Sequence, residues 1–524
     1  MVFTTAGMVH FYPEENMALK LYNTMGRKIE EFKSIRDGYV GFYGCGPTVY
    51  NYAHIGNLRA YVFLDTLDRT LTFLGYDKKH VMNITDVGHL TGDSDDGDDK
   101  MVKTAEEKHQ SVMEIAQFYT DAFFRDIDRL NIIRPDVVCK ATDHIQEMID
   151  LIKKIEANGH TYMAGGNLYY DVSTYKNYGD LANLNLDELK EGAGRRKEVV
   201  IDENKKNPQD FVLWFTKSKF ENQALTWDSP WGRGYPGWHI ECSAMSMKYL
   251  GKHFDIHTGG IDHVPVHHTN EIAQSEGSFS EEDRKQGPWV NYWLHNEFLV
   301  LQGATKMSKS SGNFLTLQSL IDKGYDALDY RFFLLGAHYR KQILFSWDAM
   351  DGAKKSREAL AGRIAKLADK SHVLKKASEK KYGKGQAADT TGMSEKACEY
   401  MGKFKDALEN DLLAPVALSM IQKVVKDNAI ENPEKIELVS RMDTVIGLKL
   451  LETAASVLEA EEKSASVNPH EGDPEAAEID ALVAERTQAK KNKDFARADQ
   501  IRDELSARGI TIVDTPTGPT WKRA

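Results

Sequence analysis

Near the start of the chain, the order of hydrophobic and polar positions predicts a strand, a helix and a second strand. A short apolar run, 39–43, ends in a turn rich in glycine and proline. From about residue 56 to 74, apolar side chains recur at three- and four-residue intervals, the spacing of a helix that buries one face. Gly75 caps this helix, and 79–84 is the next predicted strand. A strand, a glycine-bearing loop and a helix N-terminus in this order form a site for an anion.

The α/β pattern that follows changes character once. The acidic residues 92–99 show no packing pattern and are predicted to form a solvated loop. From about 112 to 235, helices mix with short strands such as 167–172, and the regular pattern then runs from Gly237 to about residue 340. A stretch of different pattern therefore separates two α/β segments.

After Trp347 the sequence becomes helical and contains few strand signals. The helical regions are predicted at 395–427, 433–459 and 476–508, and a short tail follows the last one. Two segments interrupt them: 375–385, which is basic and is predicted to be a surface loop, and 461–475, which has the composition of a linker.

Composition narrows the class of protein. Hydrophobic residues make up 41% of the 524 residues and charged residues 28%, which is typical of a globular protein with a large core. No apolar run approaches the ~18 residues of a membrane span, and the N-terminus lacks the pattern of a signal peptide. Four cysteines are too few for a disulfide framework, so we expect a reducing cytoplasm. A net charge of −12 argues against indiscriminate binding of nucleic acids, although a local basic face can still bind one.

A short motif, His54-Ile55-Gly56-Asn57, lies at the start of the first predicted helix. His54 and Asn57 are three residues apart and so lie on one helical face, while Gly56 lets a phosphate or ribose approach the backbone. The positive end of the helix favours an anion there. By itself, the motif is more typical of an incidental exposed histidine.

A second motif, Lys306-Met307-Ser308-Lys309-Ser310, lies in a loop flanked by Gly303 and Gly312. Two lysines on a hinged loop can close over a triphosphate and stabilise charge as pyrophosphate leaves. By itself, the motif is also typical of a solvated basic turn. In this order along one chain, the two motifs resemble the nucleotide-binding signatures of class I aminoacyl-tRNA synthetases. The second motif is intact, and the first has Asn57 in place of its second histidine.

Four further residues are possible zinc ligands: Cys45, Cys242, His267 and Glu271. His267 and Glu271 are four residues apart and so lie on one helical face. The cysteines form no short CxxC pair, and a buried cysteine often serves only as a small apolar side chain. The residues alone leave both interpretations open.

The segments around these four residues are similar to the zinc-binding segments of cysteinyl-tRNA synthetases. They read CGPTVY at 45–50, GWHIECSAM at 237–245 and HHTNE at 267–271, with Thr269 where the family more often has glutamate. The similarity continues through most of the chain, for example NITD at 83–86 and VNYW at 290–293. The resemblance implies one zinc per chain, held by Cys45, Cys242, His267 and Glu271.

The resemblance also implies roles for residues that contact the substrates. The cysteine-binding residues would be Thr85, Trp238, His257 and Asp262, although Trp238 also fits an ordinary core aromatic. The catalytic residues would be His54, Asn57, Lys306 and Lys309. ATP, with Mg²⁺, would contact these four together with Gly56, Gly259 and Gly260. Asp262 would pair with the substrate ammonium group. His263 and His268 are not included among the predicted site residues, because such histidines more often lie at the surface or behind the ligands.

A zinc ion suits this substrate because cysteine and serine are nearly the same shape, and a pocket based on shape separates them poorly. Zinc binds a thiolate, which is a soft ligand, better than an alcohol, and it lowers the thiol pKa. No stretch of the chain is long enough for an additional editing domain.

For the whole chain, the resemblance implies an α/β fold. A Rossmann-like parallel-sheet catalytic domain with an insertion would be followed by a helical domain and a small C-terminal module. The expected bounds are 18–345 for the catalytic domain, about 112–235 for its insertion, 346–460 for a helical domain that contacts the tRNA stem, 461–475 for a linker and 476–524 for an anticodon-binding module. The expected activity is ligation of cysteine to tRNA(Cys) through cysteinyl-adenylate, with ATP, L-cysteine and tRNA(Cys) as partners and no membrane.

Two other functions remain open from the sequence. A ligase that joins cysteine to an aminosugar would share the catalytic motifs but lack a full tRNA-binding C-terminus. A catalytically inactive homologue could bind RNA or a nucleotide for regulation, although the intact lysine motif argues against it. Lysines and arginines at 490–502 supply local positive charge for tRNA, and they fit a solvated amphipathic helix equally well.

Overall fold

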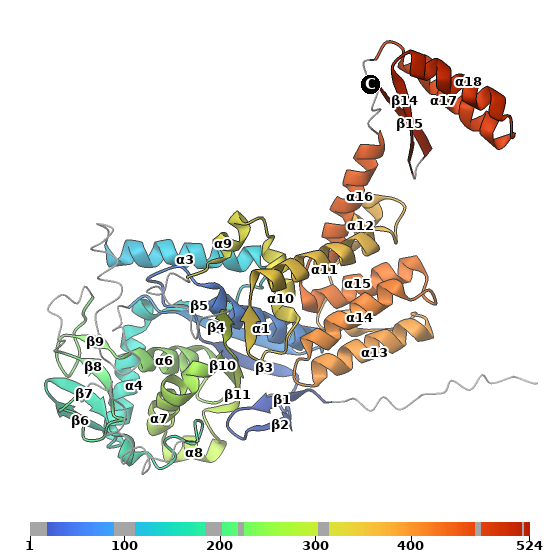
Figure 1. Ribbon diagram of the computed structural model, residues 1–524. Helices are drawn as coiled ribbons and strands as arrows, with labels where there is room; N and C mark the ends of the chain where they lie inside the picture. The colour runs from blue at the N-terminus through green and yellow to red at the C-terminus, as the bar shows by residue number, and fades with distance from the viewer. Residues whose placement is uncertain are drawn as a thin grey trace, which may run out of the picture. The chain divides into compact units, whose positions relative to one another are not determined.

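The computed structural model describes residues 18–87, 111–183, 202–217, 225–301, 314–466, 473–515 and 518–523 (Figure 1). The chain divides into two compact units, Met1–Ala455 and Ser456–Ala524. Within the described ranges, no helix combines the length and the apolar character that a membrane crossing requires.

The first unit is built around a parallel sheet of five strands in the order β11-β10-β3-β4-β5. The strands are β3 (Tyr39–Gly44), β4 (Asp77–Ile84), β5 (Val137–Lys140), β10 (Phe254–Gly260) and β11 (Val290–Asn296). Strand β3 is the central strand, and β4 and β5 follow it to one edge of the sheet. Strands β10 and β11, later in the sequence, form the other side. This order is that of a doubly wound nucleotide-binding sheet, in which ligands bind where the order reverses, between β3 and β10. The Rossmann-like α/β fold expected from the sequence is therefore confirmed.

Helices connect these strands and cover the sheet. They are α1 (Ile55–Phe73), α3 (Val112–Arg129), α4 (Ile145–Ala157), α6 (Trp238–Leu250), α7 (Thr269–Gly277) and α8 (Glu281–Gln286). The predicted strand–helix–strand unit corresponds to β3, α1 and β4. Helix α1 forms where predicted because its apolar positions Leu58, Val62, Leu67 and Leu71 are all buried.

In the sequence, a second sheet is inserted between the two halves of the parallel one. It is antiparallel, in the order β6 (Thr161–Ala164), β7 (Asn167–Tyr170), β8 (Phe211–Phe215) and β9 (Tyr235–Pro236). Strand β5 differs from expectation, because it lies inside 112–235 but pairs with β4 in the parallel sheet. Helix α3 supplies the crossover that two parallel strands require, so in the structure the separate sheet begins only at β6.

Two small pairs of strands lie beside the parallel sheet. Strands β1 (Lys20–Asn23) and β2 (Lys28–Glu31) form an antiparallel hairpin, and β12 (Leu299–Leu301) pairs in parallel with β13 (Ile343–Phe345). Between β12 and β13 lie helices α9 (Leu317–Asp322) and α10 (Ala327–Leu335).

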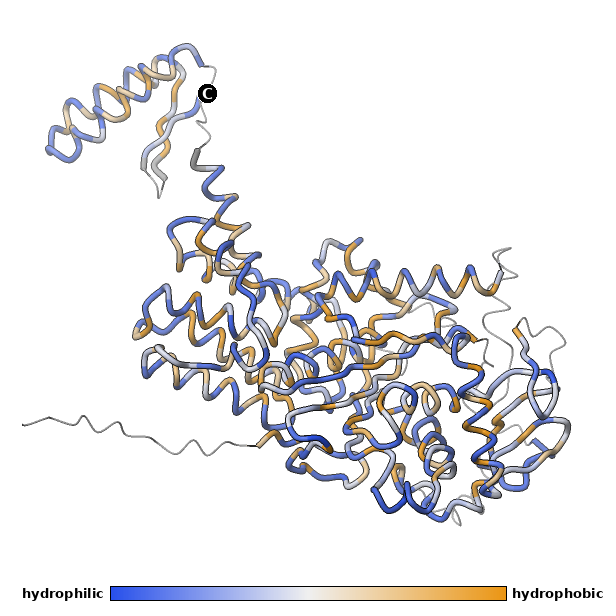
Figure 2. The backbone as a smooth tube through the Cα atoms, turned by 180° about the vertical axis from the view of Figure 1, so that it is seen from behind, coloured by the Kyte–Doolittle hydropathy of each residue, from blue (hydrophilic) through white to orange (hydrophobic). Residues whose placement is uncertain are grey.

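Helices dominate the rest of the first unit, as predicted. They are α11 (Trp347–Ala365), α12 (Ser371–Ser378), α13 (Glu395–Glu409), α14 (Ala414–Lys426), α15 (Asn432–Ile446) and α16 (Leu450–Ser466), the last of which continues past Ala455. Figure 2 shows apolar positions recurring between polar ones along them. The predicted helix 395–427 breaks where Asp411 and Leu412 adopt left-handed φ values of 57° and 55°. Helix α12 takes up the first part of the predicted loop 375–385.

Besides the end of α16, the described part of the second unit contains two helices and a hairpin. They are α17 (Ala476–Lys491), α18 (Phe495–Ala507), β14 (Ile510–Thr515) and β15 (Gly518–Arg523), and the two strands are antiparallel. Ile479, Ile501 and Trp521 are buried in its core, and Trp521 Nε1 donates a hydrogen bond to Asp480 Oδ1 at 2.7 Å. The end of the chain, expected to be a short tail, is therefore an integral strand of this unit.

Candidate metal and nucleotide site

Four side chains converge at the carboxyl edge of the parallel sheet. Cys45 follows β3, Cys242 lies in α6, His267 lies in a short π-helical turn (Val264–His268), and Glu271 lies in α7. One donor atom from each lies within 4.8 Å of the others, and all are buried except Cys45, which is half-buried. The structure thus brings together the four residues that the sequence suggested as ligands.

The carboxylate of Glu271 is fully buried and has two different environments. His257 Nε2 lies 2.9 Å from Oε2 and donates to it, since an ionised carboxylate only accepts. Oε1 lies 2.8 Å from His267 Nε2 but makes no hydrogen bond with any described residue. The charge on Oε1 is balanced by His267, and a metal ion that displaced the His267 proton would also bind this oxygen.

The charges within the cluster favour ionised ligands. Burial raises the pKa of the Glu271 carboxyl, but His257 and His267 outweigh burial and hold it below its usual value. Burial lowers the pKa of His267, yet Glu271 and Cys45 raise it to about 10. The ion pair between His267 and Glu271 is therefore formed at neutral pH without a metal.

The pKa values of the two cysteine thiols shift in opposite directions. Burial opposes ionisation of Cys45, but hydrogen bonding with Cys242 and electrostatic interaction with His268 hold the pKa of its thiol well below the usual range. Hydrogen bonding with Cys45, together with burial, raises the pKa of the Cys242 thiol well above it. A divalent cation would displace the remaining proton, because metal ligands bind as thiolates.

A second ligand set overlaps the first. Cys45, His257, His268 and Glu271 also place one donor atom each within 4.8 Å of the others. His268 Nε2 lies 3.4 Å from Cys45 Sγ, and its Nδ1 lies 2.7 Å from His295 Nε2. Sequence reasoning left His268 out, and the only signal for it was the histidine pair at 267–268.

The predicted cysteine-binding residues have different environments. The Trp238 ring lies 4.2 Å from the His267 ring, so it borders the cluster, and His257 is fully buried against Glu271. Thr85 is buried and donates to Glu241 Oε2 at 2.8 Å, a partner that the sequence did not indicate. Asp262 is exposed in the short turn that follows β10.

The predicted nucleotide-binding motif forms the N-terminus of α1. His54 is the N-cap residue: its Nδ1 accepts from the Asn57 amide at 3.0 Å, and its own amide donates to Asn57 Oδ1 at 3.2 Å. Gly56 lies between them in the first helical turn. Asn57 therefore completes a reciprocal cap that fixes both side chains at the positive end of the helix.

The two predicted glycines are at the end of β10. A Cβ atom on Gly259 would lie 2.6 Å from His268 Cε1, and one on Gly260 would lie 2.4 Å from Asp262 Oδ1. Larger residues would therefore displace the neighbouring side chains. Lys306 and Lys309 lie outside the described residues. The described chain resumes at Phe314, whose ring lies 5.8 Å from the His54 ring.

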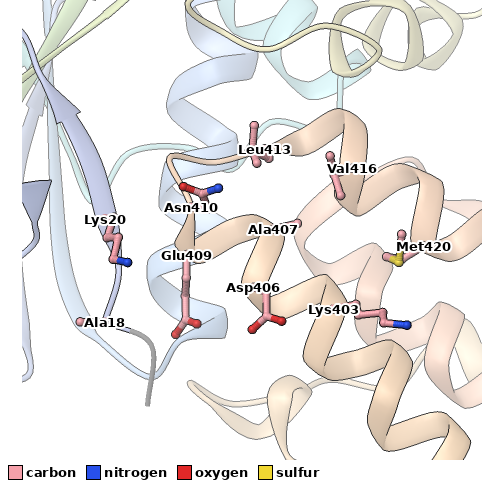
Figure 3. A pocket seen from close by; sticks show the side chains of 10 residues that line it. All are labelled: Ala18, Lys20, Lys403, Asp406, Ala407, Glu409, Asn410, Leu413, Val416 and Met420. Atoms are coloured by element: carbon pink, nitrogen blue, oxygen red, sulfur yellow. The ribbon is translucent and has the colours of Figure 1, made fainter. Parts of the chain in front are cut away.

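A groove of about 430 Å³ lies elsewhere, between β1 and the helices α13 and α14 (Figure 3). Lys20, Lys403, Asp406 and Glu409 bring both signs of charge to it, and Val416 is one of its apolar walls. It contains none of the predicted site residues.

Comparison with known proteins gives consistent similarities over almost the whole chain. Residues 31–355 match the family described as tRNA synthetases class I (C) catalytic domain, and 474–521 match the Cysteinyl-tRNA ligase anticodon binding domain. The chain is 57% identical over 510 residues to the cysteine–tRNA ligase of Treponema denticola, covering 97% of this chain and 100% of the relative. It is 45% identical over 532 residues to that of Treponema pallidum (strain Nichols), again with 97% and 100% covered.

Among solved structures, a ternary complex of Agrobacterium radiobacter K84 agnB2 LeuRS with tRNA and LeuAMS has a TM-score of 0.53 at 11% identity. The match covers 83% of this chain and 86% of that one, and at this identity it shows a shared fold only.

Proposed function

This chain belongs to the cysteine–tRNA ligase family of class I aminoacyl-tRNA synthetases, and we propose that it activates L-cysteine with ATP and transfers it to tRNA(Cys). The cysteine carboxylate would attack the α-phosphorus of ATP and release pyrophosphate. A ribose hydroxyl at the tRNA end would then attack the adenylate carbonyl and release AMP. The observation that carries this proposal is the convergence of Cys45, Cys242, His267 and Glu271 beside the nucleotide-binding edge of the sheet.

We propose zinc as the ion, held by these four residues. They offer two sulfurs, one nitrogen and one oxygen, a donor set that suits zinc, and Glu271 Oε1 is the buried oxygen that the ion would bind. The overlapping set with His257 and His268 offers only one sulfur. It would also take His257 away from Glu271 Oε2. When bound, the zinc would supply a soft Lewis acid that prefers the substrate thiolate to the hydroxyl of serine.

Two variants separate the two ligand sets. Cys242→Ser should lose zinc and cysteine-dependent exchange together, because Cys242 belongs only to the proposed set. His268→Ala should keep one zinc per chain, since His268 belongs only to the other set. Elemental analysis of both purified proteins measures this. Zinc retained by Cys242→Ser and lost from His268→Ala would reverse the assignment.

The residues around the cluster would position the amino acid. Trp238 would pack against the substrate side chain next to His267, and Asp262 would receive the ammonium group. His257 would hold Glu271 in place, and Thr85, fixed through Glu241, would line the same pocket.

ATP, with Mg²⁺, would bind along α1 and the end of β10. His54 and Asn57 would contact it from the capped helix end, and Gly56, Gly259 and Gly260 would let it approach the backbone. Lys306 and Lys309 would balance the phosphate charge as pyrophosphate leaves.

We propose 18–345 as the catalytic domain, with the antiparallel sheet as its insertion. Residues 346–460 would be a helical domain that contacts the tRNA stem, 461–475 a linker whose first residues continue α16 to Ser466, and 476–524 the anticodon-binding module. The family match at 474–521 supports the last of these. Because its substrates would include tRNA and ATP, we propose that the protein is located in the cytoplasm.

The match at 474–521 disfavours the aminosugar ligase, and the 57% identity to a full-length cysteine–tRNA ligase disfavours the inactive homologue. The deciding experiment measures ATP–pyrophosphate exchange with cysteine and with serine, followed by aminoacylation of tRNA(Cys). Exchange that depends on cysteine, together with charging of the tRNA, is expected. Exchange without charging would restore the aminosugar ligase, and absence of both would restore the inactive homologue.

A further inference from the structure

Arg59, in the second turn of α1, is a buried arginine with unusual partners. It is 3% exposed, and burial lowers its pKa to about 10. Its guanidinium donates to the backbone carbonyls of Phe298, Tyr339 and Lys341, with the Tyr339 bond at 3.1 Å. Among the described residues, its hydrogen-bond partners are all neutral carbonyls. A buried charge is costly, so this arrangement calls for an explanation beyond packing.

The carbonyls that Arg59 binds lie at the starts of two paired strands. Phe298 directly precedes β12, and its carbonyl also accepts from the Ile343 amide of β13 at 3.1 Å. The Tyr339 carbonyl, just before β13, also accepts from the Glu297 amide at 2.9 Å. The planar guanidinium, with five donors in a fixed geometry, therefore holds α1 against the entry points of both strands.

The first turn of α1 holds the chain on the other side of 302–313. The Ile55 amide donates to the Leu315 carbonyl at 2.8 Å, and the Tyr330 hydroxyl donates to the Ile55 carbonyl at 2.7 Å. His54 forms an isolated bridge with Thr316. Residues 54–59 thus contact the described chain on both sides of the segment that contains Lys306 and Lys309.

We infer that Arg59 is a positioning residue for adenylate formation, which fixes the helix carrying His54 and Asn57 relative to β12. This role rests on the proposed function, because both motifs must act on one ATP. A misplacement of about 1 Å between reacting groups can reduce a rate ~100-fold. Weakening the contacts of Arg59 should therefore lower the rate of adenylate formation.

The test compares Arg59→Lys with Arg357→Lys. Arg357 in α11 is also buried, but its partners lie outside α1: it pairs with Asp329 at 3.1 Å and donates to Thr453 Oγ1 at 3.2 Å. Lysine keeps the charge but loses the planar fork in both variants. Rates of cysteine-dependent ATP–pyrophosphate exchange are expressed per folded, zinc-loaded molecule. Cysteine affinity is measured separately by calorimetry without ATP.

Arg59→Lys should lower kcat roughly 10- to 100-fold and raise KM for ATP, with cysteine affinity unchanged. Arg357→Lys should lower Tm but keep the wild-type kcat and KM per folded molecule. Wild-type kinetics for Arg59→Lys, or an equal loss for Arg357→Lys, would show that Arg59 only stabilises the fold. An inactive wild-type protein would instead refute the proposed function.

If Arg59→Lys does not fold, Tyr330→Phe gives the answer. It removes only the hydroxyl that donates to the Ile55 carbonyl, one turn before Arg59 in α1. A lower kcat with unchanged cysteine affinity supports the positioning role, and wild-type kcat overturns it.

Discussion

At the scale of single residues, the orientation of the proposed ligands depends on histidines behind them. His267 Nδ1 lies 2.9 Å from His239 Nδ1. If His267 Nε2 binds the metal, its proton is on Nδ1 and is donated to His239, which must then carry its own proton on Nε2. His239 thus fixes both the tautomer and the ring orientation of a ligand.

We therefore expect His239→Ala to weaken zinc binding about 10- to 100-fold without abolishing it. Competition with a chelator measures the affinity in the absence of substrates. His253→Ala is the matched control, because His253 Nδ1 lies 2.8 Å from the Pro288 carbonyl oxygen and, among the described residues, His253 hydrogen-bonds with no proposed ligand. Equal zinc affinity in the two variants would remove His239 from the supporting structure.

Asp126, on the buried face of α3, should make the stability of the protein depend on pH. Burial raises its pKa to about 6, although Arg129 and Arg125 oppose this. Because the folded pKa exceeds that of the unfolded chain, the folded state binds the proton more tightly. Stability contributed by the protonated form is present below pH 4 and is lost as the pH rises to about 6.

Asp126→Asn should therefore raise the free energy of unfolding at pH 7.5 by about 1–3 kcal/mol, which would be seen as a higher Tm. The gain should vanish below pH 4, where the aspartate is protonated in both states. Thermal unfolding of both proteins across this pH range is the measurement, and a gain that does not depend on pH would refute the assignment.

At the scale of elements, the N-terminal cap of α1 affects both the stability of the helix and the position of His54. Asn57 replaces a second histidine, and its side chain closes the reciprocal cap with His54. Asn57→Ala should cost about 1 kcal/mol of stability and also raise KM for ATP, because His54 loses its fixed position. Pyrophosphate exchange and thermal unfolding report the two effects.

Glu114→Ala is the control for this prediction. Glu114 closes an equivalent cap on α3, accepting from the Ser111 amide at 2.9 Å. It should lose similar stability with unchanged KM for ATP. If both variants change KM equally, the cap of α1 has no special link to the nucleotide.

Helices and strands that are determined by their own residues were predictable from the sequence. The periodicity that buries Leu58, Leu67 and Leu71 lies entirely within α1, so its bounds were found to within a residue or two. The break between α13 and α14 was not found, because distant residues hold it. Asp411 accepts from the Tyr339 hydroxyl at 2.6 Å and from Arg340 Nε at 2.7 Å.

The same distinction applies to the site. The four possible ligands were recognisable by residue type and by resemblance. The burial of His268 depends on His295 of β11, which no local pattern reveals. Strand β15 was missed for the same reason, since its partner β14 and the residues around Trp521 come from elsewhere in the unit.

At the scale of the whole molecule, the second unit has its own core and a separate predicted role. A truncation after Ser466 keeps all of α16 and removes the region matched to the anticodon-binding domain. The truncated enzyme should keep cysteine-dependent ATP–pyrophosphate exchange and lose much of its tRNA charging, because the first unit contains the proposed ligands and α1. In the full-length enzyme, charging should depend on salt more steeply than exchange does, since basic side chains release counterions from tRNA.

Trp521→Ala in the full-length chain is the matched variant for this truncation. Trp521 is 3% exposed in a small core, and replacing such a tryptophan with alanine costs about 3–5 kcal/mol, enough to unfold a module of this size. It should therefore reproduce the truncation: normal exchange and poor charging. Both reactions are measured for the three proteins across a salt series. Charging that survives both changes would mean that the second unit does not recognise tRNA, and that the first unit alone selects it.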